Sequence, residues 1–127
     1  MARFLWVCLG GAAGSGARFL LSGWAVARLG PGFPWGTLAV NVLGSFVLAA
    51  IMVVATTTEL LSPTARLALT SGVMGGFTTY SSFNYETTQL FQSGSAVTGA
   101  INIAATVIGC LIAGVCGHFA ARLVLGR

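Results

Sequence analysis

The sequence predicts an all-α membrane protein in which four transmembrane helices form a single domain over residues 1–127. Two observations predict this class. The chain is 56% hydrophobic and only 6% charged, whereas soluble domains carry about 25% charged residues. The apolar residues also fall into four long stretches joined by short connections, which leave no room for a domain outside the membrane.

The predicted spans are residues 4–27, 36–55, 65–91 and 96–125. Each is long enough to cross the membrane, because a helix needs about 20 residues to span the hydrocarbon core. Glycine and proline in residues 30–34 predict the first turn, and Pro63 is well placed to open the third helix. The first span continues well past its basic and apolar start, so we interpret it as a retained helix rather than a signal peptide.

The arginines and cysteines argue against a nucleic-acid-binding protein and against a disulfide-rich protein. The net charge of +4 comes from arginines that form no run or stripe able to follow nucleic-acid phosphates, so we interpret them as anchors at helix ends. These arginines are Arg3, Arg18, Arg28, Arg66, Arg122 and Arg127. The cysteines, Cys8, Cys110 and Cys116, lie in apolar stretches and suggest no disulfide framework. No nucleophile is paired with a base, so we do not expect an enzyme.

The third span changes character halfway along. Residues 67–76 are apolar and glycine-rich, whereas residues 78–89 carry hydroxyls, amides and one carboxylate. The polar half must face protein or water at membrane depth. Gly75 and Gly76, followed by β-branched residues, indicate either a helix break or a kink stabilised by threonines. A break in mid-membrane would free carbonyls that favour a cation.

The second and fourth spans each carry isolated polar residues. Asn41 predicts either a hydrogen bond between helices or a donor that lines a polar path. Asn102, Thr106 and Cys110 are spaced four apart and therefore share one helical face. That face is either a weak polar track or a set of packing contacts.

Two charged side chains and a histidine also lie within or near the spans. Arg18 is expected to reach the membrane interface, to draw anions into a vestibule, or to pair with Glu86. His118 lies near the end of the last span, where an interfacial position is expected.

The polar groups of the spans favour an anion over a cation or a proton. Hydroxyl and amide hydrogens replace water around a small anion, and such groups occur at Asn41, Thr79, Ser81, Ser82 and Thr106. Tyr80 and Phe83 share a helix face, and their ring edges carry partial positive charge. No second acid accompanies Glu86 to carry a proton or strip the water from a cation.

Small residues spaced four apart predict close packing between helices. The pairs are Gly10 with Gly14, Gly72 with Gly76, and Ala113 with Gly117. Such spacing lets helix backbones approach one another. Because four short helices bury little surface among themselves, self-association is also expected.

Two segments of the chain resemble the Fluc (CrcB) family of fluoride channels. They are GTLAVNVLG at residues 36–44 and GGFTTYSSF at residues 75–83, and the glycine-rich run ending at Arg18 is similar as well. The resemblance covers essentially the whole chain. It implies a channel in the bacterial inner membrane that exports toxic fluoride passively. It also implies an antiparallel, dual-topology homodimer with two pores and a central sodium ion.

The resemblance further implies roles for particular residues. The pore would be lined by Asn41, Tyr80, Ser81, Ser82, Phe83, Asn102, Thr106 and Cys110. Arg18 would lie in the vestibule, and the backbone carbonyls of Gly75 and Thr78 would bind sodium. The chain departs from the family at Tyr80, where phenylalanine is usual, and at Cys110, where serine is often found. Its arginines are also biased toward one side of the membrane, whereas dual topology calls for little bias.

Two other functions remain open at this point. A small proton-coupled multidrug transporter is also a dimer of four-helix chains, but it needs an acid in the membrane, and Glu86 is the only candidate. A membrane assembly subunit that transports nothing would require only the glycine motifs.

Overall fold

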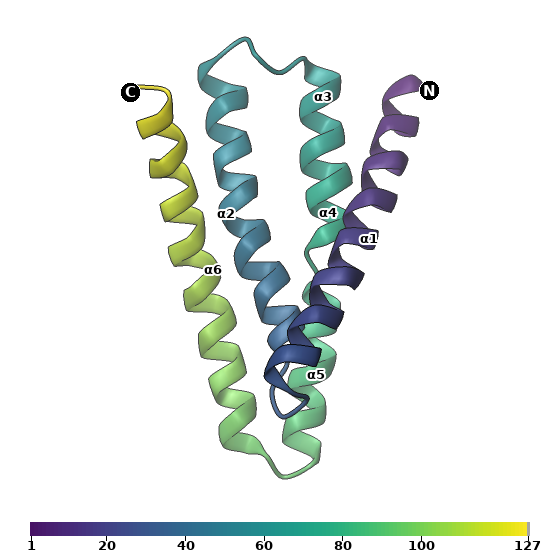
Figure 1. The fold of residues 1–127 in the computed structure, drawn as a ribbon, viewed down its shortest axis with the longest axis vertical. Helices are drawn as coiled ribbons and strands as arrows, with labels where there is room; N and C mark the ends of the chain where they lie inside the picture. Colours follow the sequence, from purple (N-terminus) through teal and green to yellow (C-terminus); the bar gives the residue numbers. More distant parts are fainter. Residues whose placement is uncertain (127) are drawn as a thin grey trace.

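The structure is a computed structural model that describes residues 1–126, and all its regular elements are helical (Figure 1). Arg127 lies outside the described residues. The elements are α1 (Ala2–Leu29), α2 (Trp35–Thr57), α3 (Pro63–Leu67), the π-helix η1 (Ala68–Met74), α4 (Gly75–Phe77), α5 (Tyr80–Gln92) and α6 (Ala96–Val124).

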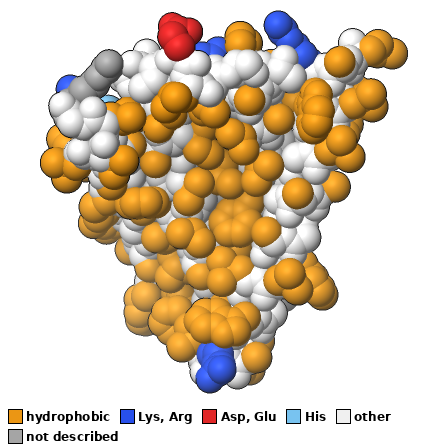
Figure 2. Space-filling model, turned by 45° about the horizontal axis from the view of Figure 1, so that its top comes forward, with side chains coloured by type: hydrophobic (Ala, Val, Ile, Leu, Met, Phe, Trp, Pro, Cys, Tyr) orange, Lys and Arg blue, Asp and Glu red, His pale blue; other side chains and the backbone are white. Residues whose placement is uncertain are grey.

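Three of these helices are long and apolar enough to cross a membrane, namely α1, α2 and α6. They confirm three of the four predicted spans to within a few residues. In the space-filling view, hydrophobic side chains cover most of the face and charged side chains lie at its two ends (Figure 2). The chain is therefore a multi-pass membrane protein.

The stretch predicted as the third span, residues 65–91, is divided among four elements. α3, η1 and α4 follow one another without a turn, and α5 continues beyond a two-residue interruption (Figure 1). Both termini lie at one end of the bundle, together with the connection from α2 to α3. Arg3, Arg66 and Arg122 are therefore near that end, while Arg28 is near the other.

The backbones of α1 and η1 touch through glycines. A Cβ atom on Gly10 would lie 2.6 Å from the carbonyl oxygen of Ala68, and one on Gly72 would lie 2.9 Å from that of Val7. A Cβ on Gly14 would clash with the carbonyl of Val73 in the same way. The predicted role of these glycines in close packing is confirmed, and the contacts are within one chain.

The interruption between α4 and α5 consists of Thr78 and Thr79. Their backbones are extended, with φ and ψ of −81° and 157° at Thr78 and −151° and 110° at Thr79. Gly75 instead has helical angles of −63° and −37°. The helix therefore continues through the glycine pair to Phe77, and the break lies at Thr78 and Thr79. Gly76 has a separate reason to be glycine, because a Cβ there would clash with the carbonyl of Gly11.

Candidate functional site

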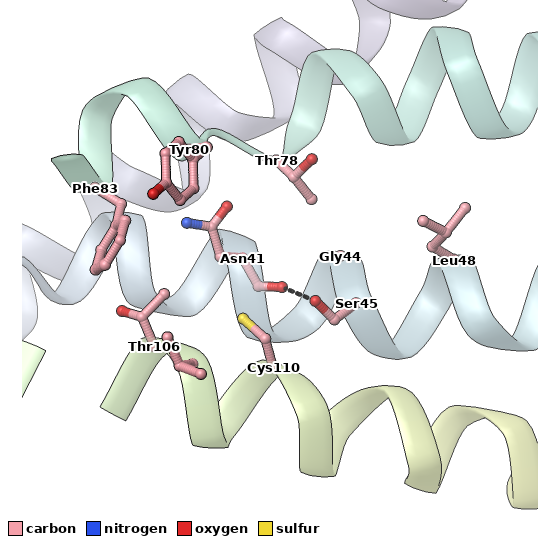
Figure 3. A pocket seen from close by; sticks show the side chains of 10 residues that line it. Asn41, Gly44, Ser45, Leu48, Thr78, Tyr80, Phe83, Thr106 and Cys110 are labelled. Carbon is pink, nitrogen blue, oxygen red and sulfur yellow. Dashed lines mark hydrogen bonds between the residues drawn. The ribbon is translucent and has the colours of Figure 1, made fainter. Parts of the chain in front are cut away.

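A groove of about 320 Å³ lies where α2, α6 and the interruption between α4 and α5 meet (Figure 3). It is lined by Asn41, Gly44, Ser45, Leu48, Thr78, Tyr80, Phe83, Thr106, Val107 and Cys110. The lining contains five of the eight predicted pore residues, and no lining residue carries a charged side chain. Segments far apart in the sequence thus form one uncharged hollow, whose mainly apolar wall carries a few hydroxyl, amide and thiol groups.

Asn41 joins α2 to the interruption through two hydrogen bonds. Its Nδ2 donates to the carbonyl oxygen of Thr79 at 3.0 Å, and its Oδ1 accepts from the backbone N–H of Thr79 at 2.7 Å. Both residues are buried. The amide therefore satisfies both backbone groups of a residue that has left the helix. Since an amide NH₂ has two hydrogens, one donor remains at a residue that lines the groove.

Gly44 makes room for the extended segment one turn further along α2. A Cβ atom on Gly44 would clash with Cγ2 of Thr78, and it would lie 3.3 Å from Cδ1 of Phe77. The Thr78 hydroxyl is directed back along the chain and donates to the carbonyl of Met74 at 2.9 Å. Nearby, the Ser45 hydroxyl donates to the carbonyl of Asn41 at 2.7 Å (Figure 3).

Tyr80 and Phe83 lie on the same side of α5, as their spacing predicted. Their ring centroids are 5.5 Å apart and their planes are inclined by 55°. Phe83 is buried, whereas 78% of Tyr80 is exposed. Tyr80 therefore projects from the surface of the single chain at the edge of the groove (Figure 3).

The two serines predicted for the pore do not line the groove. They form a hydroxyl cluster at the start of α5 with Thr79, whose Oγ1 donates to Oγ of Ser82 at 3.0 Å. Oγ of Ser81 lies 3.2 Å from the same Thr79 oxygen. Thr79 Oγ1 also accepts from the backbone N–H of Ser82 at 3.2 Å and so caps α5.

The three polar residues of α6 play different structural parts. Thr106 and Cys110 line the groove. The Thr106 hydroxyl is buried and, among the described residues, has no hydrogen-bond partner. Asn102 lies outside the lining and is 1% exposed, with its Nδ2 donating to Oγ1 of Thr87 at 2.9 Å. Asn102 therefore ties α6 to α5 through a buried hydrogen bond.

Glu86 is paired with a residue other than Arg18, the partner expected from the sequence. The hydroxyl of Thr37 donates to Oε1 of Glu86 at 2.8 Å, while Oε2 is buried and has no partner among the described residues. The expected pairing with Arg18 is not found in the described part of the chain. Thr37 lies one helical turn before Asn41, so the 3.6-residue period of α2 was the available signal. Glu86 lines a separate hollow of about 410 Å³, which lies between the connection from α1 to α2, including Phe33, and the second half of α5.

The carbonyls of Gly75 and Thr78 lie at the interruption, where the regular i to i+4 hydrogen bonds of the α-helix are broken. In an uninterrupted helix they would accept from the N–H groups of residues 79 and 82. The N–H of Thr79 donates instead to Asn41, and the N–H of Ser82 donates to Thr79 Oγ1. Both carbonyls are thus deprived of their usual α-helical donors, which fits backbone oxygens that bind a cation.

Comparisons with known proteins identify the family of the chain. The family described as CrcB-like protein, Camphor Resistance (CrcB), matches residues 5–118. A fluoride-specific ion channel FluC of Sorangium cellulosum is 58% identical over 125 residues, covering 98% of both chains. The proteins of the same name from Anaeromyxobacter sp. and Geobacter sulfurreducens are 57% and 46% identical, and the alignments cover 98% and 96% of this chain and 96% and 98% of theirs. The chain therefore belongs to the CrcB-like family.

Proposed function

We propose that this protein is a fluoride-selective ion channel that exports fluoride passively across the bacterial inner membrane. The observation that carries the proposal is the groove, where donors without charge converge from α2, α5 and α6. The printed names of the similar proteins, fluoride-specific ion channels, support the choice of fluoride.

In the proposed mechanism, the groove replaces part of the water around the ion. Thr106 contributes a buried hydroxyl that has no partner among the described residues, and Asn41 contributes its remaining amide hydrogen. The ring edges of Tyr80 and Phe83 supply further weak positive potential. A channel conducts when such binding is strong enough to admit the ion and weak enough to release it. Arg18 would attract anions toward the vestibule.

We further propose an antiparallel homodimer in which the second copy helps to close each groove, giving two pores. The exposure of Tyr80 at the groove edge supports a covering surface. In this arrangement α3, η1, α4 and α5 form one interrupted membrane crossing. A central sodium ion would be held by the carbonyls of Gly75 and Thr78, whose usual helical donors are engaged elsewhere. Its positive charge would offset the repulsion between anions.

Anion efflux from liposomes that contain the purified protein tests the proposal. Fluoride and chloride release are followed with ion-selective electrodes, without an imposed pH gradient. Fast fluoride release with negligible chloride release is expected. If the folded protein releases no fluoride, the proposal is contradicted, and a membrane assembly subunit that transports nothing becomes the better explanation. Transport that requires a proton gradient, and that is lost in Glu86→Gln, would favour the proton-coupled transporter instead.

A further inference from the structure

A second groove, which we call the apolar groove, lies between the last turn of α1, α2 and the middle of α6 and has a volume of about 540 Å³. On α2 its lining runs from Trp35 to Phe46, and on α6 it covers residues 105–113. None of its lining side chains carries a charge, a hydroxyl or an amide. The lining includes Val42, the direct neighbour of Asn41 in the first groove, and neighbours in an α-helix point about 100° apart. The two grooves therefore lie on different faces of α2.

The apolar groove is about as long as one leaflet of the membrane is thick. At about 1.5 Å per residue, the stretch of α2 from Trp35 to Phe46 is about 16 Å long, close to half of a hydrocarbon core of about 30 Å. Gly109 leaves space on the α6 side, because a Cβ there would lie 3.2 Å from Cγ2 of Val42. A Cβ on Gly117 would clash with the carbonyl of Phe46, so the two backbones touch where the lining of α2 ends. The groove thus begins at one end of α2 and stops near the middle of the membrane.

A cation and a hydrogen-bond donor lie at the outer end of the apolar groove. Trp35 is the first residue of α2, at the end of the bundle opposite the two termini (Figure 1). Its ring centroid lies 4.7 Å from that of Phe33, and its indole N–H has no partner among the described residues. Arg28 is exposed in the last turn of α1, beside the lining residue Leu29, and forms no ion pair within the described part of the chain. Tryptophan and arginine at helix ends are typical of the boundary between membrane and water.

The surrounding bilayer contains a molecule that fits both parts of this site. An acyl chain matches the apolar stretch, and an anionic headgroup complements the unpaired charge of Arg28. A second copy of the chain fits less well. In antiparallel orientation it would bring the end that carries Arg66 and Arg122 toward Arg28, and in parallel orientation it would bring its own Arg28. Both arrangements place like charges together, which is unfavourable.

We propose that the apolar groove binds an anionic phospholipid, with one acyl chain between α2 and α6 and the phosphate beside Arg28 and Trp35. The lipid belongs to the leaflet at the end of the bundle that holds the connection from α1 to α2. It fills the space that α1, α2 and α6 leave between them, and so it holds these helices together at that end. The site requires only the fold and a bilayer, so it is independent of the proposed ion conduction.

The fluorescence of Trp35 in lipid vesicles tests the site. A variant with Trp6→Phe and Trp24→Phe keeps Trp35 as its single tryptophan. It is placed in phosphatidylcholine vesicles that contain rising fractions of either dibrominated phosphatidylglycerol or dibrominated phosphatidylcholine, because bromine quenches a tryptophan that it approaches. The anionic lipid should quench Trp35 with about fivefold higher apparent affinity, the effect of one basic residue beside an anionic lipid. Equal quenching by the two lipids would overturn the anionic site. No quenching by either lipid would show that protein covers the groove.

Two pairs of variants in this background locate the bound lipid. Arg28→Gln should remove the preference for phosphatidylglycerol, whereas Arg122→Gln, which loses the same charge at the opposite end, should keep it. Ala105→Phe should fill the groove and reduce quenching by both lipids. Ala104→Phe is its control, since the neighbouring Ala104 is exposed and lies outside the lining. A preference that survives in Arg28→Gln, or that Arg122→Gln removes equally, would overturn the proposal.

Discussion

The side-chain amide of Asn41 pairs in both directions with the backbone of Thr79, through bonds of 3.0 and 2.7 Å. Thr79 is the second of the two extended residues between α4 and α5. One residue on α2 therefore stabilises the non-helical backbone and at the same time lines the groove. The two alternatives that the sequence left open for Asn41, a hydrogen bond between helices and a position on a polar path, are compatible in this geometry.

Asn41→Asp should abolish fluoride efflux and weaken the fold. The carboxylate cannot donate to the Thr79 carbonyl, and it brings a negative charge to a groove that is otherwise neutral. Loss of a partner for a buried polar group costs about 1–3 kcal/mol. Thermal unfolding in detergent and liposome efflux check the two effects. Ser45→Ala is the control, since it removes a bond to the Asn41 backbone but leaves the Asn41–Thr79 pair. Normal efflux in Asn41→Asp would remove Asn41 from the path.

Gly44→Ala should displace the interruption between α4 and α5. The added methyl group would occupy the position of Cγ2 of Thr78, whose backbone has little freedom to withdraw while Asn41 holds Thr79. Overpacking of this kind costs about 1–3 kcal/mol. We expect a lower melting temperature and reduced efflux. Gly23→Ala on α1 is the matched control because a Cβ there meets nothing within 4 Å. Equal melting temperatures for the two variants would contradict the contact.

Gly14→Ala should separate α1 from η1 and α4. Its Cβ would clash with the Val73 carbonyl and lie 2.9 Å from the Phe77 backbone nitrogen, so two backbones would have to move apart. Gly16→Ala lies two residues further along the same helix, where a Cβ meets nothing within 4 Å. Thermal unfolding should show a clear loss of stability for the first variant and little change for the second. A reversal of this order would show that α1 packs differently.

Glu86→Gln should leave passive fluoride efflux in place without any imposed proton gradient. The amide oxygen of glutamine keeps an acceptor for the Thr37 hydroxyl, so the contact between α2 and α5 is preserved. Thr37→Val, which removes the donor, is the companion variant and should lower the melting temperature. Efflux measured with and without a pH gradient separates a passive channel from proton coupling. Dependence on the gradient in the wild type, lost in Glu86→Gln, would contradict the channel.

Periodicity and composition predicted the three long helices well, because an apolar run of 20 or more residues has few alternatives in a membrane. The resemblance to the Fluc (CrcB) family implied a shared pore for Asn41, Tyr80, Phe83, Thr106 and Cys110, and these five residues line one groove. The sequence pattern also indicated a break or kink within residues 75–79, and the extended residues, Thr78 and Thr79, lie at the end of that stretch. The two glycines themselves are helical, and Gly76 is the one of the pair that packs closely against α1.

Other features of the site depend on long-range contacts that a single sequence does not display. Asn102 shares a helical face with Thr106, but its amide reaches Thr87 on another helix instead of the groove. Ser81 and Ser82 are taken up by the hydroxyl cluster around Thr79. The partner of Glu86 is Thr37, 49 residues away in the chain. Opposite charge had suggested Arg18 as the partner of Glu86. In the folded chain the Glu86 carboxylate accepts a hydrogen bond from the Thr37 hydroxyl instead.

The most direct test of the proposed path is fluoride efflux by Thr106→Val. Valine has nearly the shape of threonine, and the hydroxyl that it removes has no partner among the described residues, so the fold should lose nothing and the melting temperature should hold or rise. If this hydroxyl meets the passing ion, the same variant should release fluoride more slowly than the wild type. Slower efflux with undiminished stability would support the groove as the anion path. Unchanged efflux at unchanged stability would contradict it.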